Sequence, residues 1–576
     1  MQQTAWGFLG LVGVIALSAA LALPAWGSST LYVDADAAPG GGGENWATAY
    51  QYLQDALAAA AASGGTVTEI RVAGGTYQPD RGGGKTPGDR DATFQLLNGV
   101  ALRGGYAGNG EPDPNARDIA AYETILSGDL AGDDRLGFLN NGENSYHVIT
   151  ATGTDSTAVL DGVSITSGAS PGLIKFGSGI YIDGGSARFR DCTIRHNSAV
   201  GGGGLFVSQG SPELVGCSFR DNVAGRGAAL SAVNSNVVVR RCSFTGNRTS
   251  GSAYEVVGID GGTARIEDCA FVRNAVPAGS ALYGSGTLNV IRCTFWRNNG
   301  RAVTDVNGMG LYSDCWIVEN STGAGGVVYV SAGQPRFRRC VFHGNRASYG
   351  GAIYASNAPI QVTNCRFFGN RADSVGAAID MRGGVVTNSV FVGNRAGASG
   401  TLTCYGNVQV NHCTFSRNTS AEPGAAIRAQ GSPGSSPVVA VSNSILWGNT
   451  AGGENDQAAQ IYASSASVVL SNSNVQGLDG SLGGTGNIPS DPLFLDADGP
   501  DNVPGTLDDN VRLAQGSPCL DAASASLLPP DVADLDGDGD AVEPLPLDLD
   551  DVGRIVGSAP DMGAYEGPRP AMLIQP

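Results

Sequence analysis

A repeat of about 25 residues runs through the middle of this chain and limits what the chain can fold into. The segment QVTNCRFFGNRA, at residues 361–372, is one copy. Each copy is anchored on a Cys or Ser, with an apolar residue two positions later and an Asn five positions later. A chain that repeats one short unit this often folds as a stacked array rather than as separate globular domains. The Asn recurs in eleven copies, at Asn197, Asn222, Asn247, Asn274, Asn298, Asn320, Asn345, Asn370, Asn394, Asn418 and Asn449.

The apolar positions of each copy describe a coil of short strands. Apolar side chains stand at Val362, Cys365 and Phe367 and at the equivalent positions of other copies. Alternate residues of a strand face opposite ways, so the odd step from 362 to 365 requires a corner between them. A second strand, GGAIYAS at 350–356, recurs as GGGLFVS and GGVVYVS. We therefore predict an all-β parallel β-helix, a solenoid, over residues 160–490.

The Asn and Cys columns of this solenoid are both predicted to be structural. An Asn at a corner can hydrogen bond to the Asn of the next coil and satisfy turn groups that would otherwise be buried without partners. Exported proteins with many Cys usually form disulfides, but stacked in-register side chains keep their Cβ atoms about 4.8 Å apart, beyond disulfide range. The anchor Cys residues are thus expected to be buried free thiols. Cys404 and Cys519 lie outside the column and could pair.

The N-terminal part of the chain predicts export and a cap. Residues 1–27 contain an uncharged apolar run and end in a small-residue pattern, as in a secretory signal peptide. The same run could instead remain as a membrane anchor. Residues 28–159 are expected to form an N-terminal cap and the first irregular coils. Within them, residues 44–65 have the apolar spacing of an amphipathic helix that could cover the open end of the array.

Negative charge is concentrated in a C-terminal segment, residues 491–567, which is predicted to be an acidic cap. The chain carries a net charge of −19, and residues 491–566 hold 16 Asp and 2 Glu against 2 Arg, a net of −16. The remainder is nearly neutral, so nucleic acid is not an expected partner. Residues 568–576 form a short tail.

Two acidic loops in this segment are candidate calcium sites. In DLDGDGD, the spacing of four Asp with Gly539 at the turn is typical of the start of an oxygen-ligand calcium loop. The twelfth position is Leu545 rather than a bidentate Glu, so Glu543, Asp548 or another loop would have to complete the shell. A solvated acidic loop without metal is the alternative. The candidate ligands are Asp534, Asp536, Asp538 and Asp540 in this loop and Asp496, Asp498 and Asp501 in the preceding one.

The outward positions of the repeat supply a candidate partner surface. Later copies carry apolar and aromatic residues where early copies carry Thr, Ser and Arg, and the aromatic ones include Trp296, Trp316, Phe368 and Trp447. Either the C-terminal segment or a loop covers this strip, or the strip meets a glycan or another partner. An Arg follows the repeat Asn in three consecutive copies, and these arginines either bind an acidic glycan or extend into solvent. They are Arg346, Arg371 and Arg395.

The pairing of GGAIYA with FFGN, and of GGGLFV with FRDN, resembles the polymorphic outer-membrane protein repeats of chlamydia-type surface proteins. Those repeats lie within the right-handed, pectin-lyase-like β-helix superfamily, and the resemblance covers residues 160 to 450. It implies a right-handed coil and an adhesive or structural role at the cell surface. The ending, from DPLF to DMGAYEG, is similar to the terminal segment of exported bacterial β-helix proteins, some of which are linked to surface anchoring.

The sequence thus predicts a secreted or cell-surface β-helix protein that binds a glycan or a surface partner. Membrane contact is expected only through an uncleaved N-terminal segment or surface anchoring. The alternative is a polysaccharide lyase or glycosidase acting on an acidic polysaccharide, which needs paired carboxylates or a calcium site beside a basic residue. No catalytic residue can be assigned. The four histidines, which have no metal-ligand spacing, are His147, His196, His343 and His412.

Overall fold

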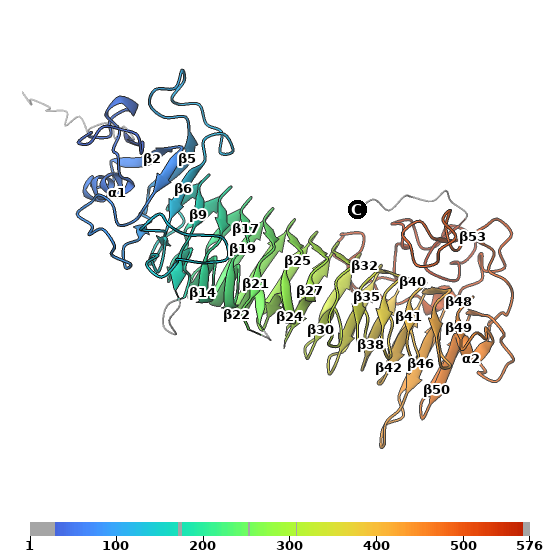
Figure 1. The fold of residues 1–576 in the computed structure, drawn as a ribbon. Coiled ribbons are helices and arrows are strands. Elements are labelled where there is room, and N and C mark those ends of the chain that lie inside the picture. The colour runs from blue at the N-terminus through green and yellow to red at the C-terminus, as the bar shows by residue number, and fades with distance from the viewer. Residues whose placement is uncertain (1–28, 171–175, 252–253, 307, 568–576) are drawn as a thin grey trace, which may run out of the picture.

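The computed structural model describes residues 29–170, 176–251, 254–306 and 308–567. These residues form an elongated parallel β-helix with a cap at one end and a C-terminal segment folded against the last coils (Figure 1). The predicted β-helix is therefore confirmed. The predicted signal peptide and the tail lie outside the described residues. Among the residues that are described, no helix is long and apolar enough to cross a membrane.

Three parallel sheets run along the rod, because equivalent strands of successive coils pair in register. The first sheet contains the strands that follow the repeat anchor: β3 (Gly75–Tyr77), β6 (Thr124–Ser127), β9 (Ser164–Thr166), β13 (Thr193–Arg195), β17 (Ser218–Arg220), β20 (Ser243–Thr245), β23 (Ala270–Val272), β26 (Thr294–Trp296), β29 (Trp316–Val318), β32 (Val341–His343), β36 (Arg366–Phe368), β40 (Val390–Val392), β44 (Thr414–Ser416), β48 (Ile445–Trp447) and β52 (Asn474–Val475). A short sheet follows it at one edge of the later coils: β33 (Arg346–Ala347), β37 (Arg371–Ala372), β41 (Arg395–Ala396), β45 (Thr419–Ser420) and β49 (Thr450–Ala451).

The largest sheet bends around the rest of each coil and takes up to three further strands from it. Its members are β1 (Ser29–Val33), β2 (Val67–Ala73), β4 (Phe94–Gln95), β5 (Ala101–Tyr106), β7 (Ile149–Thr150), β8 (Val159–Asp161), β10 (Ala169–Ser170), β11 (Ile180–Asp183), β12 (Arg188–Arg190), β14 (Ser198–Gly201), β15 (Leu205–Ser208), β16 (Glu213–Val215), β18 (Val223–Arg226), β19 (Leu230–Arg240), β21 (Arg248–Thr249), β22 (Glu255–Glu267), β24 (Ala275–Gly284), β25 (Thr287–Ile291), β27 (Asn299–Asp305), β28 (Leu311–Ser313), β30 (Val328–Val330), β31 (Arg336–Arg338), β34 (Ile353–Ala355), β35 (Ile360–Thr363), β38 (Ile379–Met381), β39 (Gly384–Thr387), β42 (Leu402–Cys404), β43 (Val408–Asn411), β46 (Ile427–Gln430), β47 (Val438–Ser442), β50 (Ile461–Ser464) and β51 (Ser467–Ser471).

The corner that the odd apolar step requires lies between β35 and β36, at Asn364, whose φ of 51° is in the left-handed region. Most other coils place a residue with a similar positive φ directly before the anchor, for example Asp268 and Arg339. A second such corner precedes each repeat Asn, as at Gly369 with a φ of 56°. The backbone therefore turns twice around β36, and the anchor and the apolar residue after it both point inward.

The eleven repeat Asn residues form a continuous chain of hydrogen bonds along the inside of the second corner. Asn345 is typical: its backbone N and its Nδ2 both donate to Asn370 Oδ1, at 3.1 and 3.0 Å. Its Nδ2 also donates to the carbonyl oxygen of Ile317, one coil back, at 2.6 Å. At the end of the chain, Asn449 Nδ2 donates to Gln460 Oε1 at 2.8 Å. Every coil is thus tied to both neighbours by buried amides.

Columns of like side chains fill the interior. The rings of Phe342, Phe367, Phe391 and Phe415 stack with centroids 4.4 to 4.7 Å apart. All eleven cysteines lie within the described residues, and all are buried and free, so the anchor thiols act as small apolar fillers. Cys404 packs in the main core, whereas Cys519 packs inside the C-terminal segment, so the two do not pair.

The N-terminal cap covers one end of this core. Helix α1 (Leu53–Ala62) buries Leu53, Leu57 and Ala60 against the first strands. The predicted helix began earlier, but Asn45 Oδ1 accepts from the backbone N of Ala47 and Thr48, and only the short turn η1 (Trp46–Thr48) forms there. The remaining elements lie toward the C-terminus: α2 (Gln457–Gln460), η2 (Ala525–Leu527) and the antiparallel pair β53 (Phe494–Asp496) and β54 (Asn510–Leu513).

Replacing one ladder Asn should destabilise the rod. In Asn345→Ala, the backbone N of Asn320 and the carbonyl oxygen of Ile317 lose buried partners. We expect the free energy of unfolding to fall by roughly 2–4 kcal/mol, since each unsatisfied buried group costs about 1–3 kcal/mol. Chemical denaturation followed by circular dichroism measures the change. Asn357→Ala, at an exposed Asn outside the ladder, is the control and should stay within about 0.5 kcal/mol of the parent.

Candidate functional site

The outward apolar strip is largely covered by the C-terminal segment. Phe368, Val390 and Val392 pack against residues of this segment that include Leu549 and Tyr565. Phe368 is only 1% exposed, so it does not lie on an accessible surface, although the sequence made it a candidate partner residue. The predicted alternative, in which the segment covers the strip, describes this part of the molecule.

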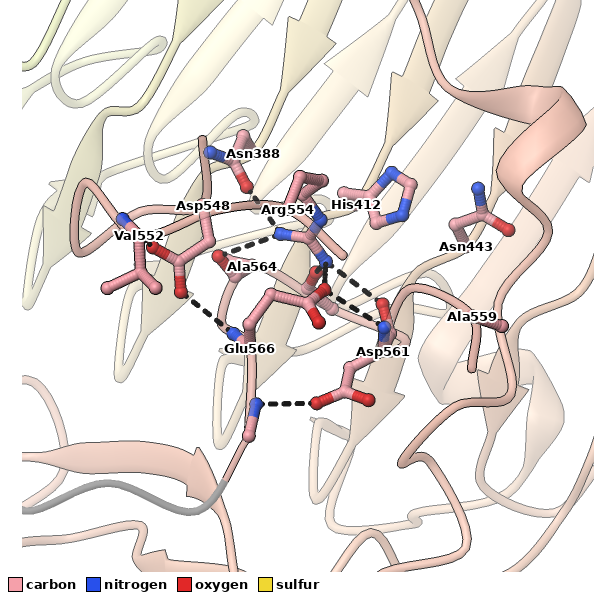
Figure 2. A network of polar contacts seen from close by, with 12 residues as sticks. Asn388, His412, Asn443, Asp548, Val552, Arg554, Ala559, Asp561, Ala564 and Glu566 are labelled. Carbon is pink, nitrogen blue, oxygen red and sulfur yellow. Dashed lines mark hydrogen bonds and ion pairs between the residues drawn. The ribbon is translucent and has the colours of Figure 1, made fainter. Parts of the chain in front are cut away.

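A buried polar network locks the C-terminal segment onto the corners of the β-helix (Figure 2). Arg554 Nη1 donates to Asn388 Oδ1 at 2.9 Å, and Asn388 belongs to a corner of the rod. Arg554 Nη2 donates to the carbonyl oxygens of Asp561 and Gly563 and lies 3.0 Å from Glu566 Oε1. Because Arg554 is fully enclosed, it positions the segment and is not available to a ligand.

The tryptophans of the strip have three different surroundings. Trp296 is half-buried, with the guanidinium groups of Arg297 and Arg273 over its ring at 4.7 and 5.3 Å. Trp316 is half-buried on β29, where no residue of the C-terminal core clusters packs on it. Trp447 lines a groove of about 550 Å³ between the rod and the segment, together with Arg417 and residues 491–498.

The three candidate arginines stack in register at one edge of the rod, on β33, β37 and β41. Asp373 Oδ1 lies 3.0 Å from Arg346 Nη2 and 3.9 Å from Arg371 Nε. Arg395 is exposed, and its side chain forms no hydrogen bond or ion pair with any described residue. This edge therefore carries three positive charges against one carboxylate.

An open groove of about 440 Å³ runs beside these arginines. Guanidinium groups and hydroxyl groups dominate its polar lining, and the hydroxyl groups come from the following two coils. The arrangement can bind a carboxylate or sulfate group through paired N–H donors while hydroxyls contact neutral parts of the same molecule. The polar lining residues are Arg371, Asp373, Arg395, Thr419, Ser420 and Thr450.

The first acidic loop does not gather its carboxylates. Asp498 Oδ2 lies 3.1 Å from Arg417 Nη1, and Asp501 Oδ1 accepts from the backbone N of Val503 at 2.8 Å. Within the described ranges, neither these two nor Asp496 belongs to a cluster of metal-ligating groups. The structure thus does not assemble the calcium site predicted at Asp496, Asp498 and Asp501.

The second acidic loop does gather carboxylates, but with a different membership from the predicted one. One set brings oxygens of Asp531, Asp536 and Glu543 within 4.8 Å of one another, and an overlapping set joins Asp536 to Asp534 and Asp538. Asp540 belongs to neither set, and its Oδ1 accepts from the backbone N of Val542. Asp548 accepts hydrogen bonds from three backbone N–H groups elsewhere in the segment. Of the two residues that were expected to complete the calcium shell, only Glu543 therefore lies in a carboxylate set.

Sequence reasoning missed Asp531, a second carboxylate set at Asp129, Asp133 and Glu143, and Asp380. A carboxylate three residues before the DxDxD run was the available signal for Asp531. Asp380 stands in the outward column of β38, in register with Tyr354 and Thr403. Its side chain is only 4% exposed, and this burial raises its pKa to about 7, with Arg382 opposing the shift.

A family-level comparison agrees with this architecture. A family model described as "Right handed beta helix region" matches residues 147–322, 258–367 and 314–475, which together span more than half of the chain. No curated protein sequence matches this chain. The crystal structure of pectate lyase Pel9A is similar over 94% of this chain and 98% of its own, with 15% identity and a TM-score of 0.22. The crystal structure of Bacteriophage CBA120 tailspike protein 3 is similar over 76% of this chain and 56% of its own, with 13% identity and a TM-score of 0.30.

The burial of Asp380 predicts a specific pH dependence of stability. Because its folded pKa of about 7 lies above the ordinary value of 3.8, the folded state keeps a proton that the unfolded state loses. The stability that this retained proton contributes is fully present below about pH 4 and is lost as the pH rises through about 7. In Asp380→Asn, thermal melts should depend less on pH in this window and show a higher stability at pH 7, by an amount on the order of 1–4 kcal/mol.

Asp183→Asn, at the exposed end of β11, is the matched control for this experiment and should keep the parental pH profile. An Asp380→Asn profile that runs parallel to that of the parent from pH 4 to 7 would contradict the assignment.

Proposed function

Since this chain belongs to the right-handed beta helix family, we propose that it is an exported, rod-shaped protein of the cell surface or extracellular space that binds an acidic polysaccharide. The observation that carries the proposal is the groove beside Arg371 and Arg395, where guanidinium groups outnumber carboxylates. The N-terminal 27 residues, which have the pattern of a secretory signal, support export. The resemblance of the repeats to those of chlamydia-type surface proteins supports an adhesive or structural role.

The spacing of the arginines suits a polymer. Paired parallel strands are about 4.8 Å apart, so arginines on consecutive coils repeat at about that distance along the rod. A chain of acidic sugars that follows the rod would meet one guanidinium at each coil, and the binding free energies of several weak contacts would add. Most of the chain's negative charge lies in the C-terminal segment, residues 491–567, so like-charge repulsion there would direct an anionic ligand to this edge.

A binding role accounts for the groove better than hydrolysis does. Glycosidases use two carboxyl groups across the scissile bond. Asp373 is the one carboxylate among the described residues that line this groove, and Arg346 and Arg371 already lie beside it. A calcium-dependent lyase would need its cation next to the basic residue, whereas the carboxylate clusters in the described ranges lie in loops 129–143 and 531–543. The described residues that line this groove therefore supply neither the two carboxyl groups of a glycosidase nor the calcium site of a lyase.

Binding to polymers of different charge tests the proposal. The intact chain should bind polygalacturonate or a sulfated glycan more tightly at low salt than at high salt, and a neutral glucan weakly or not at all. The double variant Arg371→Ala/Arg395→Ala should weaken binding by at least about 100-fold, since each charge-assisted hydrogen bond contributes about 1.5–3 kcal/mol and both arginines are removed. Isothermal titration calorimetry with oligosaccharides of defined length measures the affinity.

The control is Arg292→Ala, which removes an exposed arginine that is paired with Asp268 and does not line the groove. It should leave the affinity unchanged. Equal losses in the control and in the double variant, or no loss in either, would remove the arginine groove as the binding site.

A further inference from the structure

We propose that the loop of residues 531–543 binds one calcium ion through Asp531, Asp536 and Glu543, and that this ion fastens the C-terminal segment to the flank of the β-helix. The site is separate from the arginine groove and does not depend on the glycan-binding proposal. The sequence pattern pointed to calcium in this loop, but the ligands and the mechanical role come from the structure.

Asp531 is the observation that distinguishes this cluster from an ordinary acidic loop. The residue is 0% exposed. Its Oδ2 accepts from the backbone N of Leu535 at 2.6 Å, whereas its Oδ1 is buried without a hydrogen-bond partner among the described residues. Leaving a carboxylate oxygen buried and unpaired is costly, so such an oxygen calls for a proton or a cation.

A second enclosed oxygen faces the same cluster. Glu543 Oε1 is also buried without a partner in the described part of the chain, and Asp536 supplies the third carboxylate within 4.8 Å. Burial and the surrounding carboxylates raise the pKa of Asp531 and of Glu543. A divalent cation would satisfy both orphaned oxygens and remove the repulsion among the three carboxylates.

The ligand chemistry favours calcium over other divalent cations. All the available donors are oxygens, which excludes the softer nitrogen and sulfur sites of zinc. Calcium accepts six to eight oxygens in flexible geometry, and the neighbouring Asp534 and Asp538 can add to the shell. Gly537 and Gly539, with φ of 77° and 89°, let the loop turn tightly around that position. Magnesium, which demands a stricter octahedral shell, should bind more weakly.

Two arginines of the rod connect this loop to the β-helix. Arg338 Nη1 donates to the carbonyl oxygens of Ala533 and Asp534, at 2.7 and 3.1 Å. Arg339 Nη2 donates to the carbonyl oxygen of Leu535 at 2.8 Å. The rod thus holds the backbone of the same short stretch whose side chains would hold the ion. Without the ion, repulsion among the carboxylates would loosen this contact between the C-terminal segment and the rod.

Calcium titration of the full-length chain tests the inference. Calorimetry after removal of metal should detect one calcium site, with weaker binding of magnesium. Chelation should lower the melting temperature and speed protease cleavage in the loop, where Val542 is 83% exposed.

Isosteric variants assign the ligands. Asp531→Asn and Glu543→Gln should each weaken calcium binding at least about tenfold and make the melting temperature insensitive to chelator. Asp540→Asn, which changes an exposed carboxylate outside the cluster, should keep the calcium response of the parent. Both loop variants should still bind the acidic glycan, because the arginine groove is elsewhere.

Two results would overturn the inference. The first is a parent chain that shows no calcium binding and an unchanged melting temperature with chelator, which needs no variant and so does not depend on variant folding. The second is an Asp531→Asn chain with parental circular dichroism and a parental calcium affinity.

Discussion

The hydrogen bond from one ladder Asn to the next is the interaction on which the rest of the structure depends. Each coil of about 25 residues has too few apolar side chains to fold alone, so its neighbours must fix its position. The ladder does this at the corner before β33, where Asn345 binds Asn370 ahead and the Ile317 carbonyl behind. A coil that slipped by one residue would lose these bonds and turn its apolar residues outward.

With the interior committed to columns of Asn, Phe and Cys, recognition is left to the outward positions and to the segments that cover them. The C-terminal segment covers the apolar strip from Phe368 to Ile445. Two small hydrophobic cores and the buried Arg554 hold it there. The edge with Arg371 and Arg395 stays open. One flank of the rod is therefore a docking face for its own chain, and the neighbouring edge is available to a ligand.

The sequence predicted most of the rod because its periodicity repeats the same physical constraint eleven times. It placed a corner between Val362 and Cys365, and Asn364 turns there. It did not decide which outward residues are covered, since Phe368 and Trp296 occupy equivalent positions in the repeat and differ only in whether the non-repeating segment reaches them. The same limit applies to Asp531 and Asp380, whose burial arises from contacts that no local pattern encodes.

A crystal structure of the chain with a short acidic oligosaccharide bound tests directly whether the arginine edge is the ligand surface. We expect sugar carboxylate or sulfate oxygens within hydrogen-bond distance of Arg371 and Arg395, with neutral hydroxyls near Thr419 and Thr450. An oligosaccharide seated in the groove of Trp447, with the arginine edge unchanged, would contradict it.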